Sequence, residues 1–283
     1  MIPFRWDLVT PDQLGSLRNG TAEPTLWHLA DLVACTGKVL ARSGDADLVF
    51  VGRSLDSMYD LLGGAMTSDR LSRLPLSFAR PYAGSRRRPL TPAELSEARR
   101  ILASLSLTPH ALSRRARPVA FVDVVHEGAT FTELFELLRR WIDEDREPWP
   151  VIRRKLRFIG VTTERRTSPK TYRWQQHAPW TRQLPARSVR NVSLHPFVWS
   201  YFGDHQTKLT RSYHPDRWLA DDPGPSRDDA TRQALAEAAA LVAYGRSPAG
   251  RRALARSMGR EPALSQSWLR TMVTTLNNGA AAG

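Results

Sequence analysis

Two spacings of apolar residues alternate along the chain. Residues 25–42 place apolar side chains three and four positions apart, which predicts an amphipathic helix. Residues 47–51 form a short apolar run bounded by glycines, which is typical of a buried strand. Further strands are predicted over 74–80, 118–125, 156–162 and 189–194, and further helices over 56–66, over 130–143 and from the capping box at Thr91–Glu94.

The order of these segments indicates the fold class and the organisation of the chain. Strands that alternate with helices predict an α/β fold, with a mostly parallel twisted sheet flanked by helices. We expect an α/β domain over residues 1–220, whose part from about 165 to 220 lacks a regular period. Residues 221–228 contain Asp, Pro and Gly and predict a linker. Residues 229–283 show no strand pattern and predict a helical extension.

Composition narrows the classes of partner. The chain has 283 residues and 41 basic against 28 acidic side chains, a formal charge of +13, and only four of the basic residues are lysines. A guanidinium group suits phosphate, so a phosphate-bearing partner is expected. The single cysteine, Cys35, cannot form an internal disulfide, which favours a cytoplasmic location. No apolar run approaches the roughly 18 residues of a membrane span, so no membrane partner is expected.

The run from 119 to 131, VAFVDVVHEGATF, carries the clearest chemistry. An apolar strand ends near Asp123, and Gly128 and Ala129 then lead through Thr130 into a helix. Small residues let a phosphate approach backbone N–H groups, and a helix N-terminus favours an anion. Asp123 at the strand tip is placed to contact sugar hydroxyls or a cation, because open α/β sheets bind ligands at the carboxyl ends of strands.

This run resembles the signature by which type I phosphoribosyltransferases bind 5-phosphoribosyl-1-pyrophosphate (PRPP). In that register Asp123 matches the second acidic position, and the loop that would cradle the 5-phosphate consists of His126, Glu127, Gly128, Ala129 and Thr130. The sequence departs from the signature at Val122, which stands at the first acidic position.

Two earlier segments extend the resemblance to about residues 25–165. Gly52, Arg53 and Ser54 follow the strand over 47–51, where the family holds pyrophosphate through backbone groups, although Ser54 replaces the usual glycine. Arg86, Arg87 and Arg88 fall where the family has a basic loop that closes over pyrophosphate. A solvated basic turn is the alternative interpretation of this arginine run.

The resemblance implies Mg²⁺-dependent transfer of 5-phosphoribose from PRPP to a small-molecule acceptor, with release of pyrophosphate. His126 is the implied catalytic base, with Glu127 as the neighbouring candidate. Mg²⁺ would be held largely by pyrophosphate and ribose oxygens, and Asp123 would reach it directly or through ribose or water. The irregular region of about 165–220 corresponds to the family's acceptor-binding hood. Its aromatic segments at 172–177 and 197–218 form either an acceptor pocket or domain packing, and they match no standard salvage signature, which favours specialised metabolism.

Two alternatives remain open from the sequence. The first is a non-catalytic regulator that senses PRPP or a nucleotide and binds nucleic acid through the basic helices of the extension, where residues 246–270 carry six arginines and one acidic residue. The second is a hydrolase or exchanger of ribosides on another α/β fold. The expected partners are therefore PRPP and a small acceptor, with nucleic acid less favoured and homodimer assembly left open.

Overall fold

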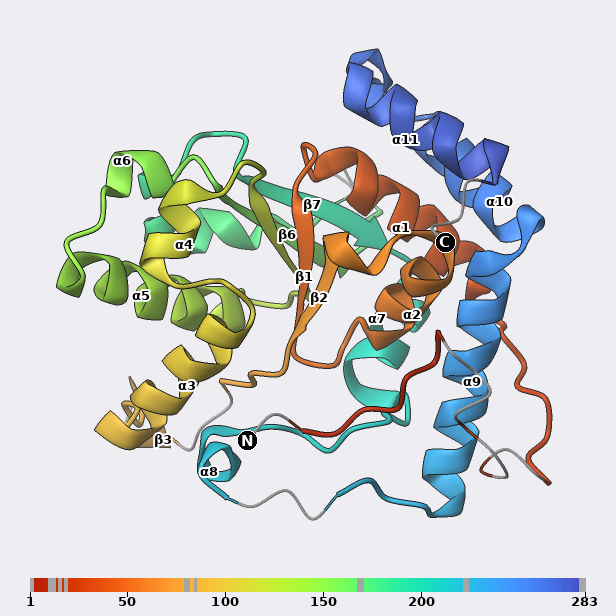
Figure 1. Ribbon diagram of the computed structural model, residues 1–283, viewed down its shortest axis with the longest axis horizontal. Helices are drawn as coiled ribbons and strands as arrows, with labels where there is room; N and C mark the ends of the chain where they lie inside the picture. The colour runs from red at the N-terminus through yellow and green to blue at the C-terminus, as the bar shows by residue number, and fades with distance from the viewer. Residues whose placement is uncertain are drawn as a thin grey trace.

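The computed structural model describes residues 3–9, 14, 17, 20–78, 82–83, 86–166, 171–220 and 224–279. Its centre is a five-stranded sheet in which all neighbouring strands are parallel, in the order β2-β1-β5-β6-β7 (Figure 1). The strands are β1 (Asp47–Val51), β2 (Leu71–Leu74), β5 (Val119–Val124), β6 (Leu156–Thr163) and β7 (Val189–Leu194). The predicted α/β fold is therefore confirmed.

Strand β2 lies earlier in the sequence than expected. The predicted strand over 74–80 begins where β2 ends, because Pro75 has no N–H for the ladder. Directly after it the Leu76 N–H donates to the Leu74 carbonyl (2.8 Å), and this tight turn leads the chain away from the sheet. A separate two-stranded ribbon follows, formed by β3 (Tyr82–Ala83) and β4 (Arg86–Arg87).

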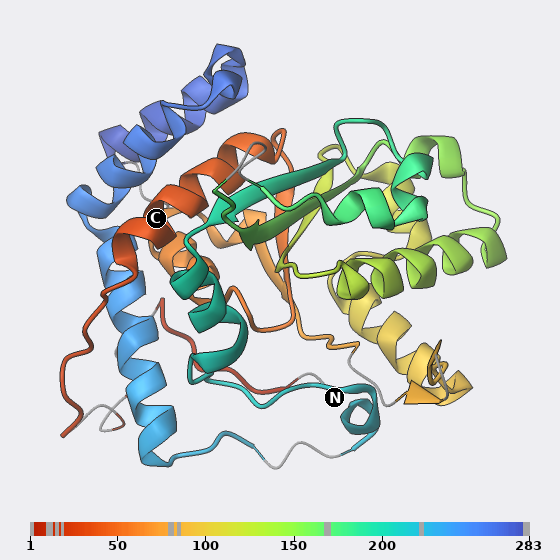
Figure 2. The same ribbon diagram turned by 180° about the vertical axis from the view of Figure 1, so that it is seen from behind.

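Helices cover both faces of the sheet (Figures 1 and 2). On one face lie α1 (Leu29–Arg42) and α2 (Asp56–Ala65), and on the other lie α3 (Pro92–Ser104), α4 (Pro109–Arg114), α5 (Ala129–Glu144) and the short α6 (Trp149–Ile152). Strand β5 shows why both faces are covered: Ala120 and Val122 join the first core, and Val119 and Phe121 join the second. A strand buried on both sides reads as a continuous apolar run, which is how it was recognised.

The C-terminal helices pack on the outer side of α1 and α2. They are α9 (Asp229–Arg246), α10 (Pro248–Met258) and α11 (Ser267–Asn278). Helix α9 approaches α2 so closely that a Cβ on Gly64 or on Gly245 would lie 2.0 Å from a backbone oxygen of the other helix. Leu254 of α10 belongs to the same core as the residues of α1 and α2. Within the described residues, the predicted extension thus shares the core of the sheet domain, and residues 221–223 and 280–283 lie outside the description.

The segment after β7 crosses the carboxyl ends of the strands. It contains α7 (Pro196–Ser200), one π-helical turn (Tyr201–His205), an extended stretch over 206–214 and α8 (Pro215–Trp218). Two 3₁₀ turns, Trp174–His177 and Pro179–Gln183, lie between β6 and β7. None of the helices in the described part of the chain has both the length and the apolarity that crossing a bilayer requires.

Candidate phosphate-binding site

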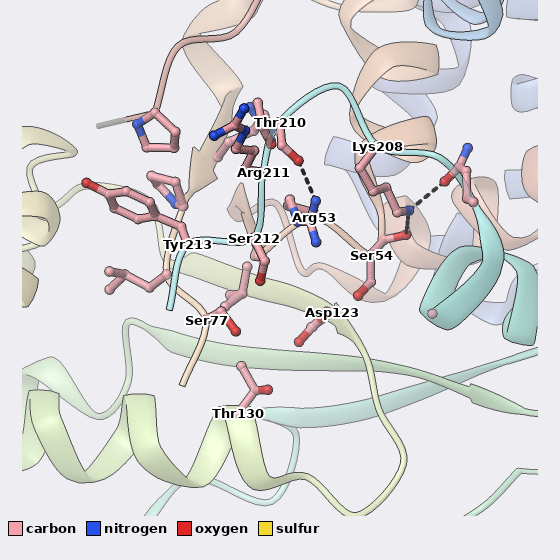
Figure 3. A pocket seen from close by; sticks show the side chains of 18 of the residues that line it. Arg53, Ser54, Ser77, Asp123, Thr130, Lys208, Thr210, Arg211, Ser212 and Tyr213 are labelled. Carbon is pink, nitrogen blue, oxygen red and sulfur yellow. Dashed lines mark hydrogen bonds between the residues drawn. The ribbon is translucent and has the colours of Figure 1, made fainter. Parts of the chain in front are cut away.

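The strand order creates a crevice between β1 and β5. From β1 the chain passes to β2 on one side, whereas β5 lies on the other side, so the connections that leave these strands diverge. Such a switch point at the carboxyl ends is where open α/β sheets bind ligands. A cavity of about 200 Å³ lies there, lined by the loop Gly52–Ser54 after β1, by Asp123 of β5, by Thr130 of α5 and by residues 203–213 (Figure 3).

Positive charge dominates this cavity. Its basic lining residues are Arg53, Arg73, Lys208 and Arg211, and its acidic ones are Asp123 and Asp204. Arg53 and Lys208 are both anchored by backbone oxygens: Arg53 donates to the Thr210 carbonyl, and the Lys208 Nζ donates to the Ser54 carbonyl at 3.2 Å. These contacts hold the two cations beside the cavity, and among the described residues neither cation forms an ion pair with a carboxylate. Arg73, in contrast, forms a two-point ion pair with Asp56 (3.0 and 3.2 Å).

Burial changes the protonation of the lining groups. It lowers the pKa of Lys208 to about 8, with the charge of Arg53 acting in the same direction. It also lowers the pKa of Arg53. It raises the pKa of Asp123 well above its usual range, because this carboxyl is 6% exposed and its Oδ1 has no hydrogen-bond partner among the described residues. The Val124 N–H and the Lys208 charge oppose that rise only in part. An anion or a polyol would therefore gain from entering this space.

Hydroxyl groups add further polar lining. Figure 3 shows Ser77, Ser212 and Thr130 around the space that Asp123 faces. The ring of His214 lies between the two serines, with its Nδ1 3.1 Å from the Ser77 Oγ and its Nε2 2.7 Å from the Ser212 Oγ. One imidazole thus ties the segment after β2 to the segment over 206–214. Hydroxyls and cations in one small cavity suit a phosphorylated sugar.

Only some of the residues predicted to bind the 5-phosphate, in the loop between β5 and α5, face the cavity. Asp123 and Thr130 line the cavity, whereas His126 and Glu127 do not belong to its lining. Their side chains are 77% and 78% exposed, and the His126 Nδ1 lies 4.0 Å from the Glu127 Oε1. The structure therefore separates the two expected bases from the cavity, and their catalytic role stays a prediction. Ala129 begins α5 and is likewise outside the lining.

Gly128 has a packing reason for its small size. Its φ of +82° is the left-handed conformation that favours glycine, and a Cβ there would lie 2.2 Å from Cε3 of Trp174. Trp174 is fully buried, and its Nε1 donates to the Asn191 Oδ1 (2.8 Å). The resemblance implies that Gly128 is small so that a phosphate can approach, whereas in the structure an indole ring occupies the position that a side chain would take.

Of the predicted arginine clamp, the structure describes the side chain of Arg88. Arg88 forms a two-point ion pair with Glu94 (2.6 and 3.0 Å) at the first turn of α3, and this pair lowers the pKa of Glu94 to about 2. Arg86 and Arg87 form strand β4, and their side chains lie outside the described part of the chain. Arg88 does not belong to the cavity lining, and the prediction for Arg86 and Arg87 is not tested by the described side chains.

Most of the described lining residues are not predicted site residues, and those with polar side chains that bear on binding include Arg73, Ser77, Lys208 and Arg211. Lys208 had a weak signal, because it is one of only four lysines in an arginine-rich chain. The segment over 206–214 has no period that would direct its side chains to the strand ends, so its contribution depends on long-range packing.

Comparison of the chain with protein-family models, with curated proteins and with solved structures finds no match in any of the three. Within the described residues, no group of three or more His, Cys, Asp or Glu side chains is placed to hold a metal ion.

Proposed function

We propose that this protein binds PRPP at the β1–β5 crevice and transfers its 5-phosphoribosyl group to a small-molecule acceptor, as a type I phosphoribosyltransferase-like enzyme. One observation carries the proposal. The loop Gly52–Ser54, and Asp123 and Thr130 from the PRPP-like run, line the same cavity although about 70 residues separate them in sequence. Two segments chosen for a shared ligand chemistry thus lie where one ligand could contact both.

The cationic side of the cavity suits the leaving pyrophosphate. As the bond from the anomeric carbon to the pyrophosphate oxygen breaks, negative charge grows on pyrophosphate and positive charge on the ribose ring. Arg53, Lys208 and Arg211 would stabilise the leaving anion, because fixed cations act most strongly where water is excluded. The Thr130 hydroxyl and the first turn of α5 would hold the 5-phosphate.

The acidic side of the cavity suits ribose and a substrate-held cation. Asp123 supplies one buried carboxyl whose Oδ1 lacks a partner among the described residues. Mg²⁺ that uses mainly substrate oxygens needs few protein ligands, so Asp123 would contact a ribose hydroxyl in its neutral form, or the ion once it has lost its proton. When bound, Mg²⁺ would neutralise charge on the pyrophosphate.

The acceptor would lose a proton as its bond to the anomeric carbon forms. His126 or Glu127 would accept this proton. Both lie at the turn after β5 and are exposed to solvent. Their separation from the lining favours a second candidate as well, namely a PRPP- or nucleotide-sensing protein without catalysis. In that case the cavity would bind PRPP, and no acceptor would release pyrophosphate.

Calorimetric titration with PRPP, with and without Mg²⁺, tests binding, with ribose 5-phosphate and pyrophosphate as partial ligands. Saturation at 100-fold above Kd should add about 2.7 kcal/mol to the free energy of unfolding. Arg53→Gln should weaken binding at least about tenfold, whereas Arg182→Gln, an exposed residue outside the cavity, should leave it unchanged.

The two candidate functions differ in the next measurement. Pyrophosphate release from PRPP in the presence of a panel of amine, hydroxyl and heterocyclic acceptors would support the enzyme. Binding without release would support the sensor. Absence of PRPP binding would refute both.

A further inference from the structure

A second basic depression lies at the opposite end of the sheet. It has a volume of about 870 Å³ and is bordered by the amino ends of β6 and β7, the end of α1 and the start of α11. We call it the arginine groove, and its basic lining residues are Arg42, Arg157, Arg173, Arg187 and Arg190. Because the candidate site occupies the carboxyl ends of the strands, the two sites lie at different ends of the same sheet.

The groove carries an excess of positive charge. Glu261 is its only acidic lining residue among the described residues, and this carboxylate is engaged by Arg42 through two hydrogen bonds (3.0 and 3.2 Å). Arg173, Arg187 and Arg190 form no ion pair in the described structure, and all three are exposed. Three guanidinium groups are therefore free to bind a ligand, beside the Arg42–Glu261 ion pair that holds one side of the groove in place.

The arginines of the groove also repel one another. Burial lowers the pKa of Arg157, and the charge of Arg190 lowers it further. Arg190 is exposed but partly desolvated, and this partial desolvation lowers its pKa, with the charges of Arg187 and Arg42 acting in the same direction. An anion with several charges would relieve this repulsion, whereas a monovalent ion would neutralise only part of it.

We propose that the arginine groove is a binding site for a small molecule with two or more phosphate groups, the chemistry of a nucleoside polyphosphate. Guanidinium groups recognise phosphate oxygens in a two-point geometry, and several of them converge here. The volume lies in the range of small-molecule sites. Trp268 adds a half-buried aromatic wall on which a base can stack, beside the exposed amide of Gln266. A concave site of this size favours a compact ligand over a nucleic-acid duplex.

Titration calorimetry with ATP and with inorganic tripolyphosphate, at low ionic strength, tests the proposal. The double variant Arg187→Ser/Arg190→Ser should weaken binding of both probes at least about tenfold. The matched control Arg182→Ser/Arg252→Ser removes the same charge from exposed positions outside the groove and should change affinity less than about twofold. Arg211→Ser changes the β1–β5 cavity and not the groove, so it shows whether a probe binds in that cavity. We expect it to leave binding of both probes to the groove unchanged.

A single-stranded oligonucleotide serves as the third probe. Binding of ATP or tripolyphosphate that is lost in the groove variant and kept in the Arg211 variant would establish the site. The proposal would be overturned if neither small probe bound, if both control and groove variants lost affinity equally, or if only the oligonucleotide bound. Failure here would leave the PRPP proposal untouched, because the two sites share no described lining residue.

Discussion

Substitution of Gly128 tests whether this residue is glycine because of packing against Trp174 or because a ligand must approach the backbone. In Gly128→Ala the new Cβ would meet the buried ring of Trp174 at 2.2 Å, and alanine would have to adopt a φ of +82°. The left-handed backbone costs an L-residue about 1–2 kcal/mol, and forcing a methyl into a packed core costs about 1–3 kcal/mol. We therefore expect a loss of about 2–5 kcal/mol, a large share of the roughly 5–15 kcal/mol of a typical domain.

Three other glycines isolate the two contributions. Gly160→Ala would contact the Nε1 of Trp174 at 2.7 Å without a positive φ. Gly224→Ala would have a φ of +81°, with no described atom beyond its chain neighbours within 4 Å of its Cβ. Gly203→Ala has neither problem, since its nearest neighbour is at 3.8 Å. We expect the loss in free energy of unfolding to be smallest for Gly203→Ala, larger for Gly224→Ala, larger again for Gly160→Ala and largest for Gly128→Ala.

Urea unfolding followed by tryptophan fluorescence measures these free energies, provided that the slope with denaturant is unchanged. PRPP titration of each variant under conditions where it is folded supplies the second readout. If Gly128→Ala unfolded at the wild-type midpoint and yet lost PRPP binding, the packing argument would be refuted. Gly128 would then serve the approach of a phosphate, as the sequence resemblance implies.

Three further predictions concern titratable groups. PRPP affinity should fall as pH rises from about 7 to 9, because Lys208 loses its proton near its pKa of about 8, and Lys208→Arg should remove this fall in calorimetry at each pH. Because the pKa of buried Asp123 is raised, the folded state keeps a proton that the unfolded chain releases, so stability should fall as pH rises from the usual range of aspartate towards that raised value. Asp123→Asn should flatten this slope in urea unfolding, and an unchanged slope would contradict the assignment. Burial raises the pKa of the Cys35 thiol to about 12, so iodoacetamide should label it only in urea, as mass spectrometry would show.

Local signals predicted the elements that local chemistry determines. Strands β1 and β7 have the predicted bounds, because each is an apolar or alternating run with clear ends. The Thr91–Glu94 capping box is present as expected: the Thr91 Oγ1 accepts from the Glu94 N–H (3.2 Å), and the Thr91 N–H donates to the Glu94 carboxylate (2.7 Å). Strand β2 was misplaced because its pairing with β1 is a long-range property that four half-polar residues do not reveal.

The candidate site was predictable where it follows strand ends. Parallel strands bring their carboxyl ends to one edge, so the residues after β1 and the carboxyl near the end of β5 had to lie close together. The residues over 206–214 had no such rule, since their path depends on contacts such as that between Arg53 and the Thr210 carbonyl. The sequence also could not predict which way the side chain of His126 points. Its position in the sequence places it near the end of a strand, but the conformation of the turn decides whether the side chain faces the cavity or the solvent.

The groups that line the cavity suit one part of the proposed reaction, the departure of pyrophosphate, better than the deprotonation of an acceptor. Arg53, Lys208 and Arg211 are cations, and Asp123 is a carboxyl whose raised pKa favours its neutral form. Such groups stabilise a departing anion and hold hydroxyls, but they are poor proton acceptors when protonated. In the proposed reaction the cavity would therefore hold PRPP and its leaving group, and deprotonation of an acceptor would depend on groups outside it, such as His126. A variant at His126 should then reduce pyrophosphate release while leaving PRPP affinity intact, whereas a variant at Arg53 should reduce both.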